Sequence, residues 1–359
     1  MRMTSILHRI ATALVAFSLP AHAGGADTAS HRFKELAPGV HFAVEAGPVF
    51  LLSNALVIVN DADVTVVDSH VTPAAARALI ASVKTLTPKP ITTVINTHYH
   101  FDHAHGNQAF PDDVTIIGHE FTREKLAGDP LRERTYTFFS KLFAENAQAV
   151  KKQAAEAKDP KARAALELQA TALANHVRDD KETRPTPPTV TLSERMTLYR
   201  GGREIEILFL GRGHTGGDVV VFLPEERIVF TGDLLLQGPS YMGDAYLDEW
   251  AATLDKVKAL DVDLIVPGHG EPFSDRAHID AVQAYMRDTW NQVVALRAKG
   301  VPALEAALRI DLTKHKSTMG PFASPLLPSG ILAPGIEPNS VLRIYELLDQ
   351  REAAGKGSQ

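Results

Sequence analysis

The segment Thr-His-Tyr-His-Phe-Asp-His at positions 97–103 constrains what this chain can fold into more than any other part of its sequence. It follows an apolar run at 91–95 that is typical of a buried strand, and functional side chains collect at the carboxyl ends of strands in open sheets. Imidazole nitrogens and carboxylate oxygens both suit zinc, and burying them without partners is costly. We therefore predict metal ligands here rather than a solvated polar turn: His98, His100, Asp102 and His103.

Three later segments repeat this arrangement, each with one ligand-type residue just beyond an apolar run. The residues are His214, Asp233 and His269, and the runs before them are 205–210, 228–230 and 264–266. A lone histidine or aspartate after a strand is more often a turn residue, so each segment alone is a weak signal. Glycines stand beside all three, however, which indicates backbone pressed close to a site with little room for side chains.

Taken together, these motifs resemble the metal motifs of the metallo-β-lactamase fold superfamily, and the resemblance extends from residue 33 to about residue 272. It implies a four-layered αββα sandwich that carries two metal ions at one edge. One ion would be held by His98, His100 and His214. The other would be held by Asp102, His103 and His269, and Asp233 would bridge the two, as in glyoxalase II-like metal sites. We expect two Zn²⁺, with Mn or Fe as possible substitutes.

Two aspartates are expected to support the chemistry of such a centre. Paired divalent ions sharing a hydroxide lower the pKa of water toward neutrality, so no serine or cysteine nucleophile is needed. Asp102 would ligate and also orient that hydroxide, which makes it the predicted catalytic residue. Asp68 follows the apolar run 64–67, where the family keeps an aspartate behind the ligands. Orienting a ligating imidazole and capping the next helix both remain open roles for Asp68.

Other residues near the motifs carry weaker signals. Three histidines lie off the motif spacing and are expected to be hydrogen-bonded structural residues: His70, His105 and His119. Tyr241 and Tyr246 are candidate substrate contacts, because aromatic rings offer flat contact area with a polar tip. Core packing explains these two tyrosines, and the neighbouring Met242 and Trp250, equally well.

The pattern along the chain predicts an α/β fold with two additions. Before residue 118, short apolar runs predict strands at 55–59, 64–67, 91–95 and 114–117, and the spacing at 73–86 predicts a helix between two of them. Two or three helices are expected in an insertion at 119–187, broken at 128–130 and 159–160. Further strands are expected at 189–192, 205–210, 219–223, 228–231 and 264–266.

These patterns divide the chain into a catalytic domain at 24–275 and a mainly helical extension at 276–359 with a last helix at 341–351. The stretch 320–338 is rich in proline and glycine. We interpret the alternating charged residues of the insertion first as a solvated helical face. The alternatives are that the insertion covers the active site or forms a homodimer surface.

Residues 1–23 have the features of a signal peptide, with an apolar run at 10–19 and the cleavage pattern Ala21-His22-Ala23. We expect cleavage after Ala23 and a periplasmic or secreted protein with no stable membrane anchor; an uncleaved anchor is the alternative. The formal charge of -6 and the pI of about 6.2 offer no broad basic surface, which argues against nucleic-acid partners. A small molecule is the expected partner.

The first functional hypothesis is an exported dinuclear hydrolase that cleaves a small carbonyl compound, namely an ester, thioester, lactone or amide. A β-lactamase is the alternative within the enzymes, although the absence of cysteine excludes the form with a cysteine ligand. The His-x-His pattern disfavours the diiron branch of the family, which has His-x-Glu there. The alternative from another class is a non-catalytic metal- or ligand-binding periplasmic protein.

Overall fold

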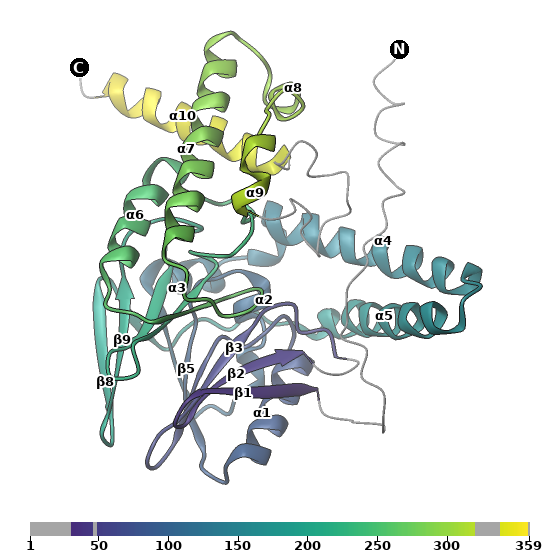
Figure 1. Ribbon diagram of the computed structural model, residues 1–359, viewed down its shortest axis with the longest axis vertical. Helices are drawn as coiled ribbons and strands as arrows, with labels where there is room; N and C mark the ends of the chain where they lie inside the picture. Colours follow the sequence, from purple (N-terminus) through teal and green to yellow (C-terminus); the bar gives the residue numbers. More distant parts are fainter. Residues whose placement is uncertain (1–29, 46–48, 320–337, 358–359) are drawn as a thin grey trace.

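The computed structural model describes residues 30–45, 49–319 and 338–357 (Figure 1). The predicted signal peptide and most of the predicted 320–338 stretch lie outside these residues. Two β-sheets form the centre, and helices cover both outer faces. Among the helices of the described ranges, none combines the length and apolar character that a membrane span requires.

The first sheet contains seven described strands that lie in the order of the chain. They are β1 (His31–Ala37), β2 (Val40–Glu45), β3 (Ala55–Val59), β4 (Val64–Val67), β5 (Ile91–Ile95), β6 (Thr115–His119) and β7 (Val190–Leu192). Strands β1 to β4 pair antiparallel, whereas β4 to β7 pair parallel. The carboxyl ends of β4, β5 and β6 therefore meet at one edge, where the predicted ligand segment begins.

The second sheet contains five described strands in the order β12-β11-β10-β9-β8. Their bounds are β8 (Arg195–Arg200), β9 (Arg203–Phe209), β10 (Val219–Leu223), β11 (Ile228–Gly232) and β12 (Leu264–Pro267). Strands β10 and β11 are buried along their whole length, and their β-branched and aromatic residues suit a sheet covered on both faces. The predicted strands match closely, but β8 is a polar edge strand that the apolar pattern did not predict.

Alternation of side chains along the strands gives each sheet two apolar faces. Residues such as Phe42 and Phe230 meet in a core between the sheets. On the outer face of the first sheet, Val57 and Val94 pack with helix α1 (Pro73–Leu86). Helices α6 (Leu247–Ala259) and α7 (Ala277–Ala298) cover the second sheet. The layers are thus αββα, as predicted.

The insertion contains α3 (Glu120–Ala127), α4 (Arg134–Glu156) and α5 (Pro160–Asp179). Helices α4 and α5 lie side by side as a hairpin that extends away from the sandwich (Figure 1). The side chain of Asp159 accepts the backbone N–H of Ala162, which caps α5 where the sequence predicted a break. The inner face of the hairpin is aromatic and packs on Phe50 and Phe101, so the insertion has a buried face besides its solvated one.

The C-terminal region is helical, as expected. It contains α7, α8 (Ala303–Ala307), α9 (Lys316–Met319) and α10 (Pro338–Gly357). Val341 and Ile344 of α10 are buried in the same core as α6 and α7. This part of the chain therefore thickens the helical layer over the second sheet.

Candidate metal centre

The predicted ligand segment leaves β5 and turns into the short helix α2 (Phe101–Ala104). This turn directs several side chains to one point at the sheet edge. The ligand atoms of His98, His100 and His214 lie within 4.8 Å of one another, and so do those of Asp102, His103 and His269. The structure thus forms two adjacent groups of three donors from segments more than 100 residues apart.

Asp233 lies between the two groups. Its Oδ2 is 3.5 Å from Nε2 of His214 and 3.3 Å from Nε2 of His269, which belong to different groups. Its Oδ1 is 3.3 Å from Nε2 of His103. A single carboxylate therefore faces both donor groups, which is the position that a bridging ligand needs.

The donor atoms fit divalent cations. Nε2 of His98, Nε2 of His103 and Oδ1 of Asp233 are buried and form no hydrogen bond of normal geometry among the described residues, although the last two atoms lie 3.3 Å apart. Buried polar atoms are normally paired, so unpaired atoms that converge on one point indicate a ligand. Imidazole nitrogens with carboxylate oxygens suit zinc, and they also suit manganese or iron.

Most of these imidazoles donate their second ring N–H to a fixed acceptor, which leaves the other nitrogen free to ligate. Nδ1 of His103 is 2.8 Å from Oδ2 of Asp68, and Nδ1 of His98 is 3.0 Å from Oγ1 of Thr97. Nδ1 of His269 is 3.0 Å from the carbonyl oxygen of Leu52. The resulting tautomers all place Nε2 toward the centre.

Asp68 supports the centre and does not cap the following helix. Helix α1 is capped by Thr72, whose side chain accepts the N–H of Ala75. The buried carboxylate of Asp68 accepts from the backbone N–H of Thr97 at 2.8 Å, from its hydroxyl and from His103. Of the two roles that the sequence left open, the structure has the orienting one.

The two donor groups differ in the direction in which their surroundings shift the pKa of their histidines. Burial lowers the pKa of His98 well below its usual value and that of His214 to about 3, so both are neutral donors at pH 7. Burial would also lower the pKa of His103, but Asp102, Asp233 and Asp68 raise it well above the usual value. The second group thus concentrates negative charge that favours a cation.

Glycines make room for the ligands, as the sequence indicated. A Cβ on Gly268 would lie 2.3 Å from Oδ1 of Asp233 and 2.8 Å from Cε1 of His103. Gly232 has a φ of +52°, and a Cβ there would lie 2.6 Å from Oγ1 of Thr97. Side chains at these positions would push the ligand segments apart.

One functional residue escaped the sequence prediction. Nε2 of His100 is 3.0 Å from Oδ2 of Asp244, and that carboxylate also accepts the hydroxyl of Thr135 at the start of α4. His100 thereby presents Nδ1, which is 2.8 Å from Nε2 of His214. Asp244 lies among residues 241–250, where the aromatic side chains are the only sequence signal, and no spacing links it to His100.

The two candidate substrate tyrosines lie in different surroundings. The ring of Tyr241 is 6.4 Å from that of His100 and 5.1 Å from that of Phe139 in α4. Tyr241 therefore belongs to an aromatic wall beside the centre. Tyr246 instead packs against the guanidinium groups of Arg212 and Arg343, at 4.2 and 4.8 Å.

The three other histidines lie outside the donor groups. His70 contacts His31 at 3.1 Å and Ser53 at 3.3 Å, and His119 accepts the N–H of Phe121. These two are hydrogen-bonded, as expected. His105 is buried against aromatic rings, and its Nδ1 has no hydrogen-bond partner in the described part of the chain.

Comparison with known proteins places the chain in a wider group. A model of the metallo-beta-lactamase superfamily matches residues 48–269. A linear primary-alkylsulfatase from Pseudomonas sp. is 25% identical over 283 residues, which cover 72% of this chain and 49% of that protein. A type 2 metallo-beta-lactamase from Bacillus cereus is 33% identical over 90 residues, or 23% of this chain and 35% of that protein.

Among solved structures, the sec-alkylsulfatase Pisa1 from Pseudomonas sp. matches with a TM-score of 0.58 and 17% identity, covering 88% of this chain and 49% of that one. At this identity the likeness shows the fold alone. The chain spans about half the length of the alkylsulfatases that it matches.

Proposed function

The chain belongs to the metallo-beta-lactamase superfamily, and from this premise we propose that it is a metal-dependent hydrolase acting at the cluster of histidines and aspartates. The family includes hydrolases such as sulfatases and β-lactamases. The observation that carries the proposal is Asp233, whose carboxylate faces both donor groups. Two Zn²⁺ are the proposed ions.

Bound divalent ions would supply a water of lowered pKa and would polarise the bond to be cleaved. The protein's own contribution is orientation. His98, His103 and His214 have side chains no more than 1% exposed, whereas the side chain of His269 is 21% exposed and that of Asp102 9%. The side chain of Asp233 is 10% exposed, so we propose that substrate approaches from the side of His269, Asp233 and Asp102.

Asp102 is the proposed catalytic residue. Its Oδ2 lies 3.1 Å from Nε2 of His269 and 3.4 Å from Nε2 of His103. Burial alone would raise the pKa of Asp102, but these histidines hold it well below its usual value, so the carboxylate is ionised at pH 7. An ionised Oδ2 at the open side of the cluster can orient an attacking water and receive its proton.

For the substrate we propose a small carbonyl compound of the ester, thioester, lactone or amide class. The aromatic wall formed by Tyr241 and Phe139 favours a molecule with an apolar part. An alkyl sulfate ester is the second candidate, because the alkylsulfatase relative matches over most of this chain. A β-lactam is supported by the shorter β-lactamase match.

A panel of substrates on zinc-replete protein tests the proposal. It contains a carboxylic ester, a thioester, a lactone, an amide, a β-lactam and an alkyl sulfate. We expect turnover of a carbonyl compound that a chelator abolishes and added zinc restores. Binding of two zinc equivalents without turnover of any compound would favour a non-catalytic metal-binding protein. Turnover that survives complete metal removal would overturn the metal-dependent mechanism.

Export is a separate proposal that depends on residues 1–23 alone. Sequencing the amino terminus of the protein recovered from expressing bacteria tests it. A terminus at Gly24 in the periplasmic fraction is expected, and an intact terminus at Met1 would contradict cleavage.

A further inference from the structure

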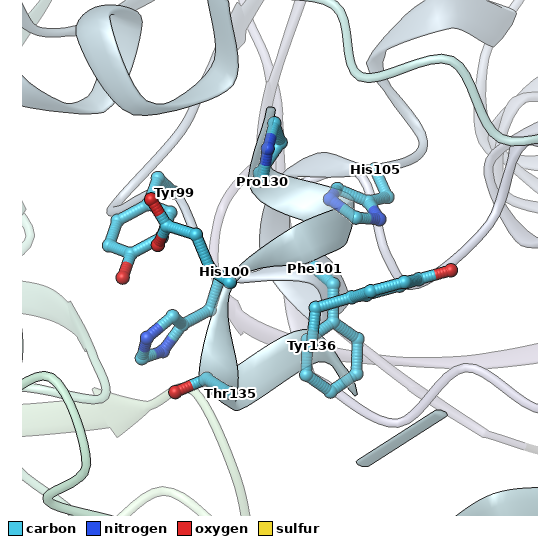
Figure 2. Close-up of a pocket in the computed structure, with 8 residues that line it drawn as sticks. Tyr99, His100, Phe101, His105, Pro130, Thr135 and Tyr136 are labelled. Atoms are coloured by element: carbon cyan, nitrogen blue, oxygen red, sulfur yellow. The ribbon is translucent and has the colours of Figure 1, made fainter. Parts of the chain in front are cut away.

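The support behind His100 comes partly from the helical insertion. Asp244 precedes α6, and its carboxylate lies 3.0 Å from Nε2 of His100. The hydroxyl of Thr135, in the first turn of α4, donates to the same oxygen, Oδ2. In Figure 2, Thr135 and His100 extend to the same side, away from His105 and Tyr136.

Neighbouring residues of α4 hold the Asp244 loop in place. Arg134 donates to the carbonyl oxygen of Gly243 at 2.7 Å, and it forms an ion pair with Glu346 of α10 at 2.6 Å. The hydroxyl of Tyr241 is 3.0 Å from Oγ1 of Thr135. The insertion and the C-terminal helix are thereby both joined to the loop that carries Asp244.

A carboxylate behind a ligating imidazole fixes its tautomer and ring orientation. His100 differs from the other oriented histidines because it must ligate through Nδ1, the nitrogen nearer the backbone. Its Nε2–H must then point away from the centre, and Asp244 is the acceptor that lies there. The contact of Nδ1 with Nε2 of His214 fits either tautomer, since either ring can donate, whereas the carboxylate of Asp244 can only accept and so selects the tautomer with a proton on Nε2.

We propose that Asp244, held by Thr135 of the insertion, is a positioning residue that aims Nδ1 of His100 at the ion shared with His98 and His214. The inference rests on the proposed function, because it takes the cluster to be a metal centre. It assigns to the α4–α5 hairpin a role in the centre itself. Loss of the Thr135 hydroxyl should then lower the affinity for one ion and not for the other.

Zinc titration of metal-free protein, by calorimetry with a competing chelator, measures this directly. For Asp244→Ala we expect the affinity for one of the two ions to fall about 10-fold, the low end for such supporting partners. The other ion should retain its affinity. The visible spectrum of the cobalt(II)-loaded protein should change for the same ion only, which a general loss of stability would not produce.

The threonine series separates positioning from folding. Thr135→Val removes the donor at nearly constant shape and should weaken the same ion about 3-fold, while Thr135→Ser keeps the hydroxyl and should restore wild-type affinity. Thr137→Val is the matched control, since Thr137 lies on the same helix and its hydroxyl, within the described residues, donates to the backbone oxygens of Glu133 and Arg134 and not to the Asp244 loop. This series carries the test if Asp244→Ala does not fold.

The outcomes distinguish a failure of the positioning role from a failure of the proposed function. If wild-type protein binds two zinc ions but Asp244→Ala and Thr135→Val bind them equally well, the positioning role is wrong and the proposed function stands. Equal weakening of both ions would also overturn it. If the wild-type protein binds no zinc, the proposed function fails, and the positioning role fails with it.

Discussion

Two carboxylates stand behind the candidate ligands, and they reach the centre from different regions of the molecule. Asp68 follows β4 of the sandwich, and its side chain is fully buried and contacts His103. Asp244 lies in a loop outside the sheets, its side chain is 19% exposed, and it depends on α4 for its position. One candidate donor group is thus contacted by a carboxylate of the sandwich, whereas the carboxylate behind the other group also contacts the insertion.

This difference shows how an addition to a common fold can become part of its centre. The sandwich fixes Asp68 through backbone and side-chain donors of Thr97, which follows the adjacent strand β5. The insertion contacts the carboxylate of Asp244 through Thr135 and the neighbouring backbone of Gly243 through Arg134. The positioning proposal therefore predicts that a change in the insertion alters the donor group of His100 and leaves the donor group of His103 unchanged.

The largest effect is expected from Asp102→Ala, which removes a candidate ligand from the donor group of His103 and His269. Hydrolytic turnover should fall about 10²- to 10⁴-fold, because the carboxylate that orients water and accepts its proton is lost. The fold should persist, since Ser53 bonds the backbone oxygen of Asp102, which alanine retains. Steady-state kinetics and circular dichroism check this.

Asp112→Ala, at an exposed aspartate a few residues beyond the ligand segment, is its control and should keep wild-type activity. Full activity in Asp102→Ala would remove Asp102 from the mechanism.

The second-largest effect is expected from Asp68→Asn, which should lower the affinity for the ion that Asp244→Ala leaves unchanged. The carboxylate receives three donors, from Thr97 and His103, and an amide would turn an N–H toward one of them. Zinc affinity should fall on the order of 10- to 100-fold at the ion held by His103. Weakening at the same ion as in Asp244→Ala would show that the two supports are not separate.

The smallest effect concerns the stability of the insertion and its dependence on pH. His176 of α5 is buried against Phe50 and Phe143, and burial lowers its pKa from 6.5 to about 4. As the pH is lowered, His176 binds a proton near pH 6.5 in the unfolded chain but only near pH 4 in the folded chain. The free energy of unfolding therefore decreases as the pH is lowered from about 6.5 to about 4.

Urea denaturation at pH 7 and pH 4.5 compares wild type with His176→Leu. The wild type should lose on the order of 2 kcal/mol more stability between these pH values than the variant, which has no group to titrate at this position. Identical losses in both proteins would mean that His176 does not carry this pH dependence.

The sequence by itself predicted the seven candidate donors that the structure brings together, and the order of the layers, because both follow from short-range sequence patterns. Each ligand follows a short apolar strand, and a strand that ends at the sheet edge brings its next residue to the same place as its neighbours. Apolar periodicity likewise identified α1, the inserted helices and most strands. Strands β1 and β2 were not among the predicted strands, and the polar edge strand β8 was missed because its half-exposed residues lack that pattern.

Only the tertiary structure decided how the ligands are supported. Asp244 and Thr135 stand 109 positions apart, and Asp244 is 144 positions from His100, so no local pattern could join them. The sequence also could not distinguish Tyr241 from Tyr246. Only the packing shows that Tyr241 lies beside His100 and that Tyr246 lies against two arginines. The ends of neighbouring strands lie close together because the strands are paired in one sheet. Contacts between an insertion and a loop instead depend on how whole helices pack, which short-range spacing in the sequence does not encode.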